Sequence, residues 1–521
     1  MGFPDAGVPP ILAGYDANIE KVLGKFGEKD AGLIEYIQRF DHVLVDEYQD
    51  IVGIRAALLA EVIRHLRSDC GLTIFADSAQ AIYGFTTDES SNLQADGSVG
   101  SAEEAYLALL TIRDFENHAL QKIYRTDEQG LLRLLDESRR VVLETGVSGG
   151  ARLAKIRGRI EALAPRRCNR DDYDGLRGRD DTLVLYRRRT EVLLNSSFLS
   201  TNGVEHRLRM SGMPALPKSW IGRVLAEIIT TEVRRSEFST LWRERMLPRP
   251  AEGASEDLAW LTLRRLAGSR RGEGVEMLAL RNLLARARPP SELCDPDMGS
   301  RGPILGTIHA SKGREAERVL LMLPSAEGGA DDSNLEEESR VLYVGATRAR
   351  RELAVGEGYG SPSGRLQSGR VFRIAREYVA AQVEIGRAGD FEPGAHMMEG
   401  NARLAQETLL GLSAAVEVEA RAAAAYGFEH RVYARLGNKI VHVATFSEQL
   451  KHDLWEVSKS VGTRHRKHGL RPALQIKHMF LIGVCTSALS DEDDRVIDRP
   501  YQLSKVFLAP VIKGFPMVFY S

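Results

Sequence analysis

Cysteine is scarce in this sequence, and no C-x-x-C pair occurs among the four that are present: Cys70, Cys168, Cys294 and Cys485. This argues against a zinc ribbon, an iron–sulfur cluster or a disulfide scaffold. No apolar run approaches the roughly 20 residues of a membrane helix, and the first residues lack the basic and apolar regions of a secretory signal. An excess of charge is also missing, since 70 basic and 72 acidic residues leave a net charge of −2. We therefore expect a soluble, cytoplasmic protein without a membrane partner, which meets any polyanion through local basic patches.

The length and the apolar pattern predict several α/β domains. The 521 residues are enough for three to four domains of roughly 150 residues each. Residues 31–80 alternate between helical and strand patterns, with short apolar strands expected at 42–45 and 72–75. Such alternation is typical of a parallel sheet. Further apolar stretches predict a second α/β region: 182–186, 304–308, 318–323 and 352–355.

Two adjacent carboxylates, Asp46 and Glu47, follow the first expected strand in the segment VDEYQD, residues 45–50. An aspartate in this position can hold a magnesium ion through its waters, while a neighbouring glutamate can activate the water that attacks a γ-phosphate. An acidic pair after a strand can equally be a solvated strand end or a helix N-cap. The added Gln49 and Asp50 favour the chemical interpretation.

A second polar segment, FADSAQAIYGF at residues 75–85, ends the next expected strand. The amide of Gln80 can sense a phosphate, and the rings of Tyr83 and Phe85 can stack on nucleic-acid bases at about 1–3 kcal/mol each. Taken alone, two aromatic residues at this spacing are more often part of a core or a turn. This segment indicates a functional site only in combination with the other polar segments of the sequence.

Two later segments have a similar character. GTIHASKGREAE, residues 306–317, places small and polar residues after a strand, which suits contact with a phosphate backbone. EEESRVLYVGATRAR, residues 336–350, repeats basic residues along a helical stretch. Arg340 and Arg348 are either surface charges or, for one of them, an arginine finger in phosphoryl transfer.

In this order the four segments resemble the second (Walker B), third, fifth and sixth motifs of the UvrD/Rep type of superfamily 1 DNA helicases. The resemblance covers about residues 35–355, and a weaker match, LQKIYRT at 120–126, falls where the fourth motif belongs. It implies two RecA-like domains of the P-loop NTPase type, which close on ATP and move 3′ to 5′ along DNA. It also implies ATP and Mg²⁺ as cofactors, and single-stranded or partly duplex DNA as the partner.

The resemblance also implies a role for each matching residue. Asp46 would hold the magnesium ion, Glu47 would activate water, and Arg125 and Arg348 would contact the γ-phosphate as catalytic arginines. The expected nucleotide-binding residues are Gln80, Tyr124, Glu315 and Arg340. The expected DNA-binding residues are Tyr83, Phe85, Thr307, His309 and Lys312.

One motif of the family is missing from the sequence. No Gly-Lys-Thr or Gly-Lys-Ser occurs in the 521 residues, whereas the family's first motif is a glycine-rich loop with this ending, which cradles the phosphates. Only 45 residues precede Asp46. Smaller departures at Ala76, Thr86 and Ile123 affect DNA contacts more than hydrolysis. We therefore expect the first RecA-like sheet to be incomplete.

Two interpretations of this departure remain open. As a fragment or truncated form, the chain belongs to an ATP-dependent DNA helicase and is weakly active or inactive alone. As a complete protein, it is a non-hydrolysing protein that binds single-stranded DNA or a partner. The joint presence of Glu47, Gln80, Arg125 and Arg348 favours the first interpretation.

The expected domains follow from these assignments. The predicted boundaries are a remnant of the first RecA-like domain at 1–115, a second RecA-like domain at 116–214 and 301–356, a helical insertion at 215–300, a helical linker at 357–425, and a C-terminal α+β or β-rich module at 426–521. The densest basic cluster begins at Arg464 and includes Arg466 and Lys467. We expect it to contact phosphates or to dock a protein partner through the C-terminal module.

Overall fold

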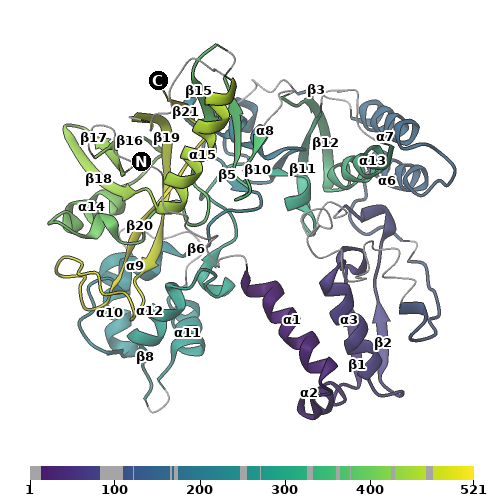
Figure 1. Cartoon of the computed structure of the whole chain (residues 1–521), viewed down its shortest axis with the longest axis horizontal. Coiled ribbons are helices and arrows are strands. Elements are labelled where there is room, and N and C mark those ends of the chain that lie inside the picture. Colours follow the sequence, from purple (N-terminus) through teal and green to yellow (C-terminus); the bar gives the residue numbers. More distant parts are fainter. Residues whose placement is uncertain are drawn as a thin grey trace. The chain divides into compact units, whose positions relative to one another are not determined.

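The computed structural model separates the chain into two compact units (Figure 1). It describes residues 13–82, 109–120, 122–164, 167–168, 174–246, 255–269, 272–324, 332–359, 364–375, 377–423, 429–464, 473 and 475–520. The first unit comprises Met1–Arg167, Ser311–Leu321 and Ala326–Val355, and the second comprises Cys168–Ala310, Met322–Ser325 and Gly356–Ser521. The first unit thus combines the predicted remnant with parts of the predicted second RecA-like domain, which differs from the boundaries expected from the sequence.

The first unit begins with a two-stranded parallel sheet, β1 (His42–Val45) and β2 (Gly71–Ile74). Val43 pairs with Leu72 and Val45 with Ile74, and these four side chains pack into one core with the helices around them. Those helices are α1 (Ala13–Gly27), α2 (Ala31–Ile37) and α3 (Ile54–His65). The parallel pairing expected from the helix–strand alternation is confirmed.

The remainder of the first unit contains three longer helices and two strands. The helices are α6 (Gln129–Val142), α7 (Gly149–Leu163) and α13 (Asp332–Ala346), and the strands are β11 (Ala316–Leu323) and β12 (Ala349–Glu357). The Ser148 side chain accepts the Ala151 N–H and so caps α7 at its N-terminus. Helix α13 packs against α6 and α7, and β12 lies beside β11. Two short 3₁₀ helices, η1 (Tyr48–Asp50) and η2 (Ser78–Gln80), follow β1 and β2.

The second unit opens with parallel strands and a group of helices. Strand β10 (Ile304–Thr307) pairs in parallel with β4 (Thr182–Tyr186) and β5 (Arg207–Arg209), and α8 (Arg189–Thr201) connects β4 to β5. Residues 215–300 contain α9 (Ser219–Leu225), α10 (Arg235–Met246), α11 (Glu256–Ala267) and α12 (Met277–Leu284), together with the short pairs β6 (Leu216–Pro217) with β9 (Cys294–Asp295) and β7 (Glu232–Val233) with β8 (Val275–Glu276). Trp220, Phe238, Trp242 and Trp260 form the centre of this helical group.

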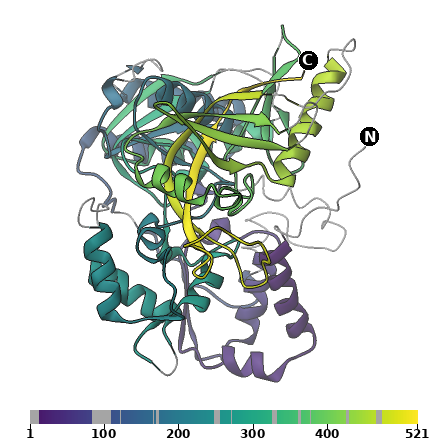
Figure 2. The same cartoon turned by 90° about the vertical axis from the view of Figure 1, so that its left-hand side faces the viewer.

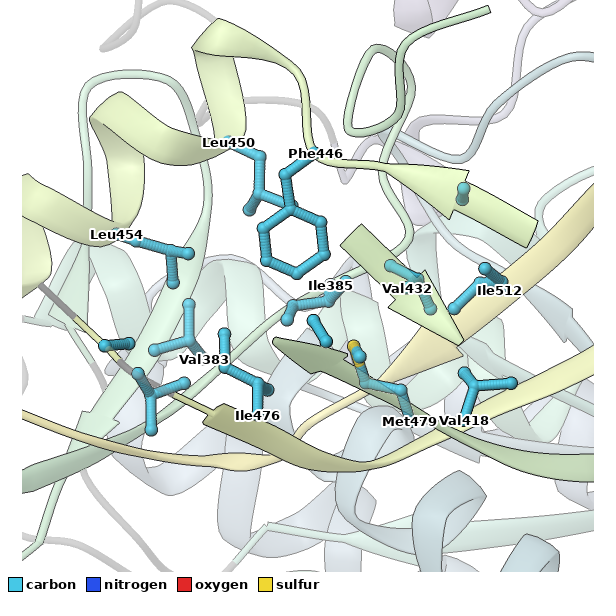
Figure 3. Packing of buried hydrophobic residues seen from close by; sticks show 14 of the residues in the cluster. Val383, Ile385, Val418, Val432, Phe446, Leu450, Leu454, Ile476, Met479 and Ile512 are labelled. Carbon is cyan, nitrogen blue, oxygen red and sulfur yellow. The ribbon is translucent and has the colours of Figure 1, made fainter. Parts of the chain in front are cut away.

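A large antiparallel sheet occupies the rest of the second unit. Within the part of the chain that the structure describes, it contains β13 (Gly364–Arg365), β14 (Val371–Ile374), β15 (Ala380–Val383), β16 (Val416–Ala422), β17 (His430–Leu436), β18 (Lys439–Thr445), β19 (Gln475–Ala488), β20 (Val506–Gly514) and β21 (Met517–Phe519). Helix α15 (Glu448–Arg464) covers one face, where Leu450 and Leu454 meet Val383 and Ile476 (Figure 3). Helix α14 (Ala402–Leu410) packs against β18 and β20.

The prediction of a helical linker at 357–425 is wrong. This stretch contains the strands β13–β16 and a single longer helix, α14, among its described residues. Its alanines favour a helix in isolation, but β15 pairs with both β14 and β21, and Ala380 and Ala381 are buried in the sheet. Tertiary pairing therefore overrides local propensity here.

Strands β19 and β20 extend beyond the antiparallel sheet as far as the helical group of residues 215–300 (Figure 2). Ala488 and Val506, at the far ends of these strands, belong to the same core as Trp220. The Thr486 hydroxyl donates to the Lys218 carbonyl at 2.7 Å and accepts the Gly222 N–H at 2.8 Å. The two parts of the second unit therefore share one core.

Several charged groups are buried in the second unit. Arg370 donates to Asp390 and to Asp453, and all three side chains are almost fully enclosed. Elsewhere, the Lys513 amino group lies within hydrogen-bonding distance of Ser196 Oγ and His206 Nε2, which are themselves 2.8 Å apart. Burial lowers the pKa of Lys513 well below its usual value. Among the described residues, no helix combines the length and apolar character required to cross a membrane.

Candidate nucleotide-hydrolysis site

The polar residues of the first unit gather at the carboxyl ends of β1 and β2. Asp46 and Glu47 follow β1 directly, and Asp77 and Gln80 follow β2. Because the two strands are parallel, their carboxyl ends lie at the same edge of the sheet, where open α/β sheets bind ligands. Asp46 and Glu47 are both exposed there. The sequence segments that were recognised separately therefore meet in space.

Gln49 connects the turn after β1 to the turn after β2. Its buried amide donates to Glu47 Oε2 at 2.5 Å and accepts the Asp77 N–H at 2.9 Å. Glu47 itself has a φ of 50°, in the left-handed region that non-glycine residues seldom occupy. This conformation and the bond from Gln49 together fix the direction of the Glu47 carboxylate.

Gln80 is held at the end of β2 by Asp77. The Gln80 amide donates to Asp77 Oδ2 at 2.8 Å, while Asp77 Oδ1 accepts the Ala79 N–H at 3.1 Å. Arg139 of α6 forms an ion pair with the same carboxylate. The amide oxygen of Gln80, Oε1, is thereby directed away from Asp77.

Arg348 meets that oxygen from the other end of the sequence. Its Nη2 lies 3.0 Å from Gln80 Oε1, a hydrogen bond between residues 268 positions apart. The guanidinium also donates to the Val344 carbonyl and the Thr347 hydroxyl, both at 2.9 Å, and it is almost fully buried. Burial, together with the charge of Arg125, lowers the pKa of Arg348 to about 10, so the side chain remains cationic at neutral pH.

Arg125 and Glu315 form a second pair beside Arg348. Arg125 binds Glu315 through Nε and donates from Nη1 to the Thr347 carbonyl at 2.8 Å. Arg350 donates to the other oxygen of Glu315 at 2.9 Å. Burial raises the pKa of Glu315, but the hydrogen bonds from the two arginines outweigh it and leave the pKa below its usual value. The expected fourth, fifth and sixth motifs thus converge on this carboxylate.

Lys312, expected to contact DNA, is instead enclosed among the acidic residues. Its side chain is 6% exposed, and its ammonium lies 2.5 Å from Asp50 Oδ1, 2.9 Å from the Gln80 carbonyl oxygen and 3.5 Å from Glu47 Oε2. Burial raises the pKa of Asp50, and the Lys312 ammonium acts against this rise. This position favours a role in which Lys312 holds the acidic residues in place, rather than a role in contacting DNA.

Other expected site residues lie apart from this group or outside the described residues. Tyr124 is 82% exposed, with the Lys122 ammonium 4.6 Å from its ring centroid. Arg340 forms an ion pair with Glu336, one turn earlier in α13. Thr307 and His309 belong to the second unit, at the end of β10 and in the 3₁₀ helix η6 (His309–Ser311). Tyr83, Phe85 and the basic residues Arg466 and Lys467 are not among the described residues, and nor is the side chain of Arg464.

Some of the residues that shape this site could not be expected from the sequence. In the sequence Gln49 stands out only as part of VDEYQD, although its amide hydrogen-bonds to residues at both strand ends. Arg139 belongs to none of the recognised motifs. It enters the site only because it lies on the face of α6 toward Asp77. A glutamine two positions after an acidic pair is the one sequence signal that could have indicated this role.

The carboxylates are suited to a hydrated magnesium ion bound together with phosphates. Among the described residues, no group of three or more His, Cys, Asp or Glu side chains is arranged to hold a metal by itself. Magnesium, however, commonly takes one or two carboxylates, several waters and substrate phosphate oxygens. Asp46 meets this requirement, because it is exposed and its Oδ1 is oriented by the Glu47 N–H at 2.8 Å.

Comparison with known proteins agrees with this arrangement. Residues 13–98 match the family model of the UvrD/REP helicase N-terminal domain, and residues 272–357 match that of the UvrD-like helicase C-terminal domain. The ATP-dependent DNA helicase UvrD2 of Mycobacterium tuberculosis (strain H37Rv) and that of Mycobacterium bovis are each 26% identical to the chain over 374 residues, which cover 65% of this chain and 50% of the relative. The chain therefore spans about half the length of these curated relatives.

A solved structure of a helicase also resembles the chain. It is the Pif1 helicase from Bacteroides in complex with ADP-AlF3 and ssDNA, which is 12% identical, with a TM-score of 0.31, over 62% of this chain and 72% of that one. The similarity to helicases depends on the two matching family models and on the motif residues that the first unit brings together. By these features the chain is similar to the UvrD-type superfamily 1 helicases.

Proposed function

We propose that the first unit carries the hydrolysis residues of an ATP-dependent DNA helicase that moves 3′ to 5′, and that this polypeptide alone turns ATP over weakly or not at all. The observation that carries the proposal is the hydrogen bond between Gln80 and Arg348. It joins the third and sixth motifs at the strand ends where Asp46 and Glu47 lie. Gln80 and Arg348 can therefore contact the same phosphate group.

Each residue of the site has a separate role in the proposed hydrolysis of ATP. Glu47, directed by Gln49, accepts a proton from the attacking water, and Arg348 stabilises the charge that develops on the γ-phosphate. Arg125 is a second cation, held close to Arg348 by Glu315 and the Thr347 carbonyl. A magnesium ion bound at Asp46 would neutralise phosphate charge. No Gly-Lys-Thr/Ser loop is available in the 521 residues to cradle the phosphates, which is why we expect little activity.

A non-hydrolysing role is the second candidate, and the missing phosphate loop favours it. In that role the chain would bind single-stranded DNA or a protein without turnover. Charge-based DNA binding weakens with salt, and loss of Arg464, Arg466 and Lys467 should weaken it further. Binding that is absent, or that does not respond to salt, would count against this candidate.

Metal-dependent nucleotide binding tests the proposed site directly. We expect the chain to bind ATP measurably in the presence of Mg²⁺ by calorimetry, and Asp46→Asn to remove the dependence on the metal. Asp41→Asn is the matched control, because Asp41 is an exposed carboxylate at the opposite end of β1. An equal effect of both variants would contradict the assignment of Asp46.

Turnover assays test the second half of the proposal. We expect little or no DNA-stimulated ATP hydrolysis by the chain alone. Robust turnover that disappears in Glu47→Gln would show that the polypeptide needs no further phosphate ligands. It would refute the expectation of weak activity while leaving Glu47 as the base.

A further inference from the structure

The side-chain amide of Gln80 has one orientation, because its two neighbours are of opposite kinds. Its nitrogen Nε2 donates to Asp77 Oδ2 at 2.8 Å, and its oxygen Oε1 accepts from Arg348 Nη2 at 3.0 Å. A carboxylate only accepts hydrogen bonds and a guanidinium only donates them, so the reversed amide would meet both neighbours with the wrong group. An amide NH₂ group has two N–H donors, and the second is left for a phosphate oxygen. The Asp77 carboxylate therefore determines which end of the Gln80 amide a ligand meets.

Asp77 is itself held by Arg139 of helix α6. Asp77 Oδ1 accepts the Ala79 N–H at 3.1 Å and forms the ion pair with Arg139 Nη1. This carboxylate adjoins the amide that we expect to contact the γ-phosphate, and without a cation its charge would repel a phosphate group there. Arg139 therefore neutralises Asp77 and, by binding Oδ1, leaves Oδ2 for Gln80.

Arg139 also contacts helix α13. Its guanidinium donates a hydrogen bond to the Tyr343 hydroxyl. Burial raises the pKa of Tyr343, so this hydroxyl is neutral. Tyr343 is buried in the last turn of α13, and its carbonyl accepts the Thr347 N–H at 2.9 Å, directly before Arg348. Arg139 is thus in contact with both segments that supply the hydrogen bond between Gln80 and Arg348.

We propose that Arg139 is a positioning residue that orients Gln80 toward the γ-phosphate and so makes the site prefer nucleoside triphosphates to diphosphates. It acts through Asp77, which leaves an N–H of Gln80 for the phosphate. It also acts through Tyr343, which holds the end of α13 from which Arg348 extends. A diphosphate has no γ-phosphate for Gln80 to contact, so only a triphosphate gains from this arrangement. This inference rests on the hydrolytic function proposed above.

The exposure of Arg139 distinguishes this role from a purely structural one. Its side chain is 43% exposed, and ion pairs at such exposure add little to stability. Arg139→Met should therefore leave the melting curve followed by circular dichroism nearly unchanged. Arg140→Met is the matched control, because Arg140 is 76% exposed and pairs with Asp136 of the same helix.

Nucleotide binding by the full chain measures the preference for a triphosphate. AMP-PNP, a triphosphate analogue that resists hydrolysis, and ADP are each titrated by calorimetry in the presence of Mg²⁺. The native chain should bind AMP-PNP more tightly than ADP, and Arg139→Met should reduce this preference about tenfold, as for the loss of one charge-assisted hydrogen bond. Adding Asp77→Asn to Arg139→Met should restore part of the preference, because the uncompensated charge is removed. A purely structural defect would not be rescued in this way.

The orientation of the Gln80 amide can also be observed without a nucleotide. Labelling with ¹⁵N-glutamine makes the side-chain amides visible by nuclear magnetic resonance, and the signal that disappears in Gln80→Ala identifies Gln80. Arg139→Met should shift this signal, because the amide loses its fixed partner, whereas Arg140→Met should leave it in place.

The outcomes separate this inference from the proposed function. A Gln80 signal that responds only to Arg139→Met, in a chain that binds neither nucleotide, would support the positioning of Gln80 by Arg139 and refute the hydrolytic function. A preference for AMP-PNP that Arg139→Met leaves unchanged would overturn the inference and leave the proposed function intact. Equal effects of Arg139→Met and Arg140→Met on the preference or on the Gln80 signal would also overturn it.

Discussion

Replacing Lys513 by methionine should stabilise the second unit, and the gain should shrink as the pH rises. Burial lowers the pKa of Lys513 well below its usual value, so the folded protein releases the proton of this amine at a lower pH than the unfolded chain, which holds it up to about pH 10.5. The unfolded state then carries one extra proton, and stability must rise with pH. One proton corresponds to about 1.4 kcal/mol per pH unit. Over the pH range in which the folded amine is neutral and the unfolded one is charged, the native protein should therefore gain about 1.4 kcal/mol per pH unit relative to Lys513→Met.

Tryptophan fluorescence is a suitable probe for this measurement. The chain has four tryptophans, Trp220, Trp242, Trp260 and Trp455, and all lie in the second unit with Lys513. Urea unfolding of the native protein and of Lys513→Met at pH 7, 8 and 9 gives the difference in free energy of unfolding at each pH. Lys439→Met, at an exposed position of β18, is the control for loss of a surface charge. A difference that does not change with pH would refute the reasoning, because Lys513 would then be charged in the folded protein.

Two further predictions concern buried polar groups. Gln49→Ala should weaken the first unit by about 1–3 kcal/mol, because the Glu47 and Asp77 partners lose their hydrogen bonds; faster amide hydrogen exchange across residues 42–82, absent in the exposed variant Gln38→Ala, would show it. Arg370→Met should destabilise the second unit by about 3–5 kcal/mol, since Asp390 and Asp453 would be left as buried charges without their partner. Urea unfolding followed by tryptophan fluorescence would detect the loss, and an equal loss in the exposed variant Arg435→Met would contradict the explanation.

The strands and polar segments of the first unit could be predicted because their signals are local. The apolar runs at 42–45 and 72–75 are short and bounded by polar residues, and they correspond to β1 and β2. Asp46, Glu47 and Gln80 follow these strands in the sequence, and parallel pairing then brings them to one edge. The prediction of their proximity needed no information about distant parts of the chain.

The unpredicted features depend on contacts between residues distant in the sequence. The enclosure of Lys312 by Asp50 joins positions 262 residues apart, and no local pattern indicates it. The strands between residues 364 and 422 could not be predicted, because β15 pairs with β14 and with β21, the latter near residue 519. Alanine-rich sequence there carries a helical propensity that only the completed sheet overrides.

The shared core around β19 and β20 limits how the second unit can change in evolution. Because Ala488 and Val506 complete the core around Trp220, the antiparallel sheet cannot be removed without exposing that core. A deletion after residue 356 would remove those side chains, and with them the Thr486 bonds to Lys218 and Gly222, and so expose the interior of the helical group. A shortened descendant of this protein would therefore have to lose the helical group and the sheet together.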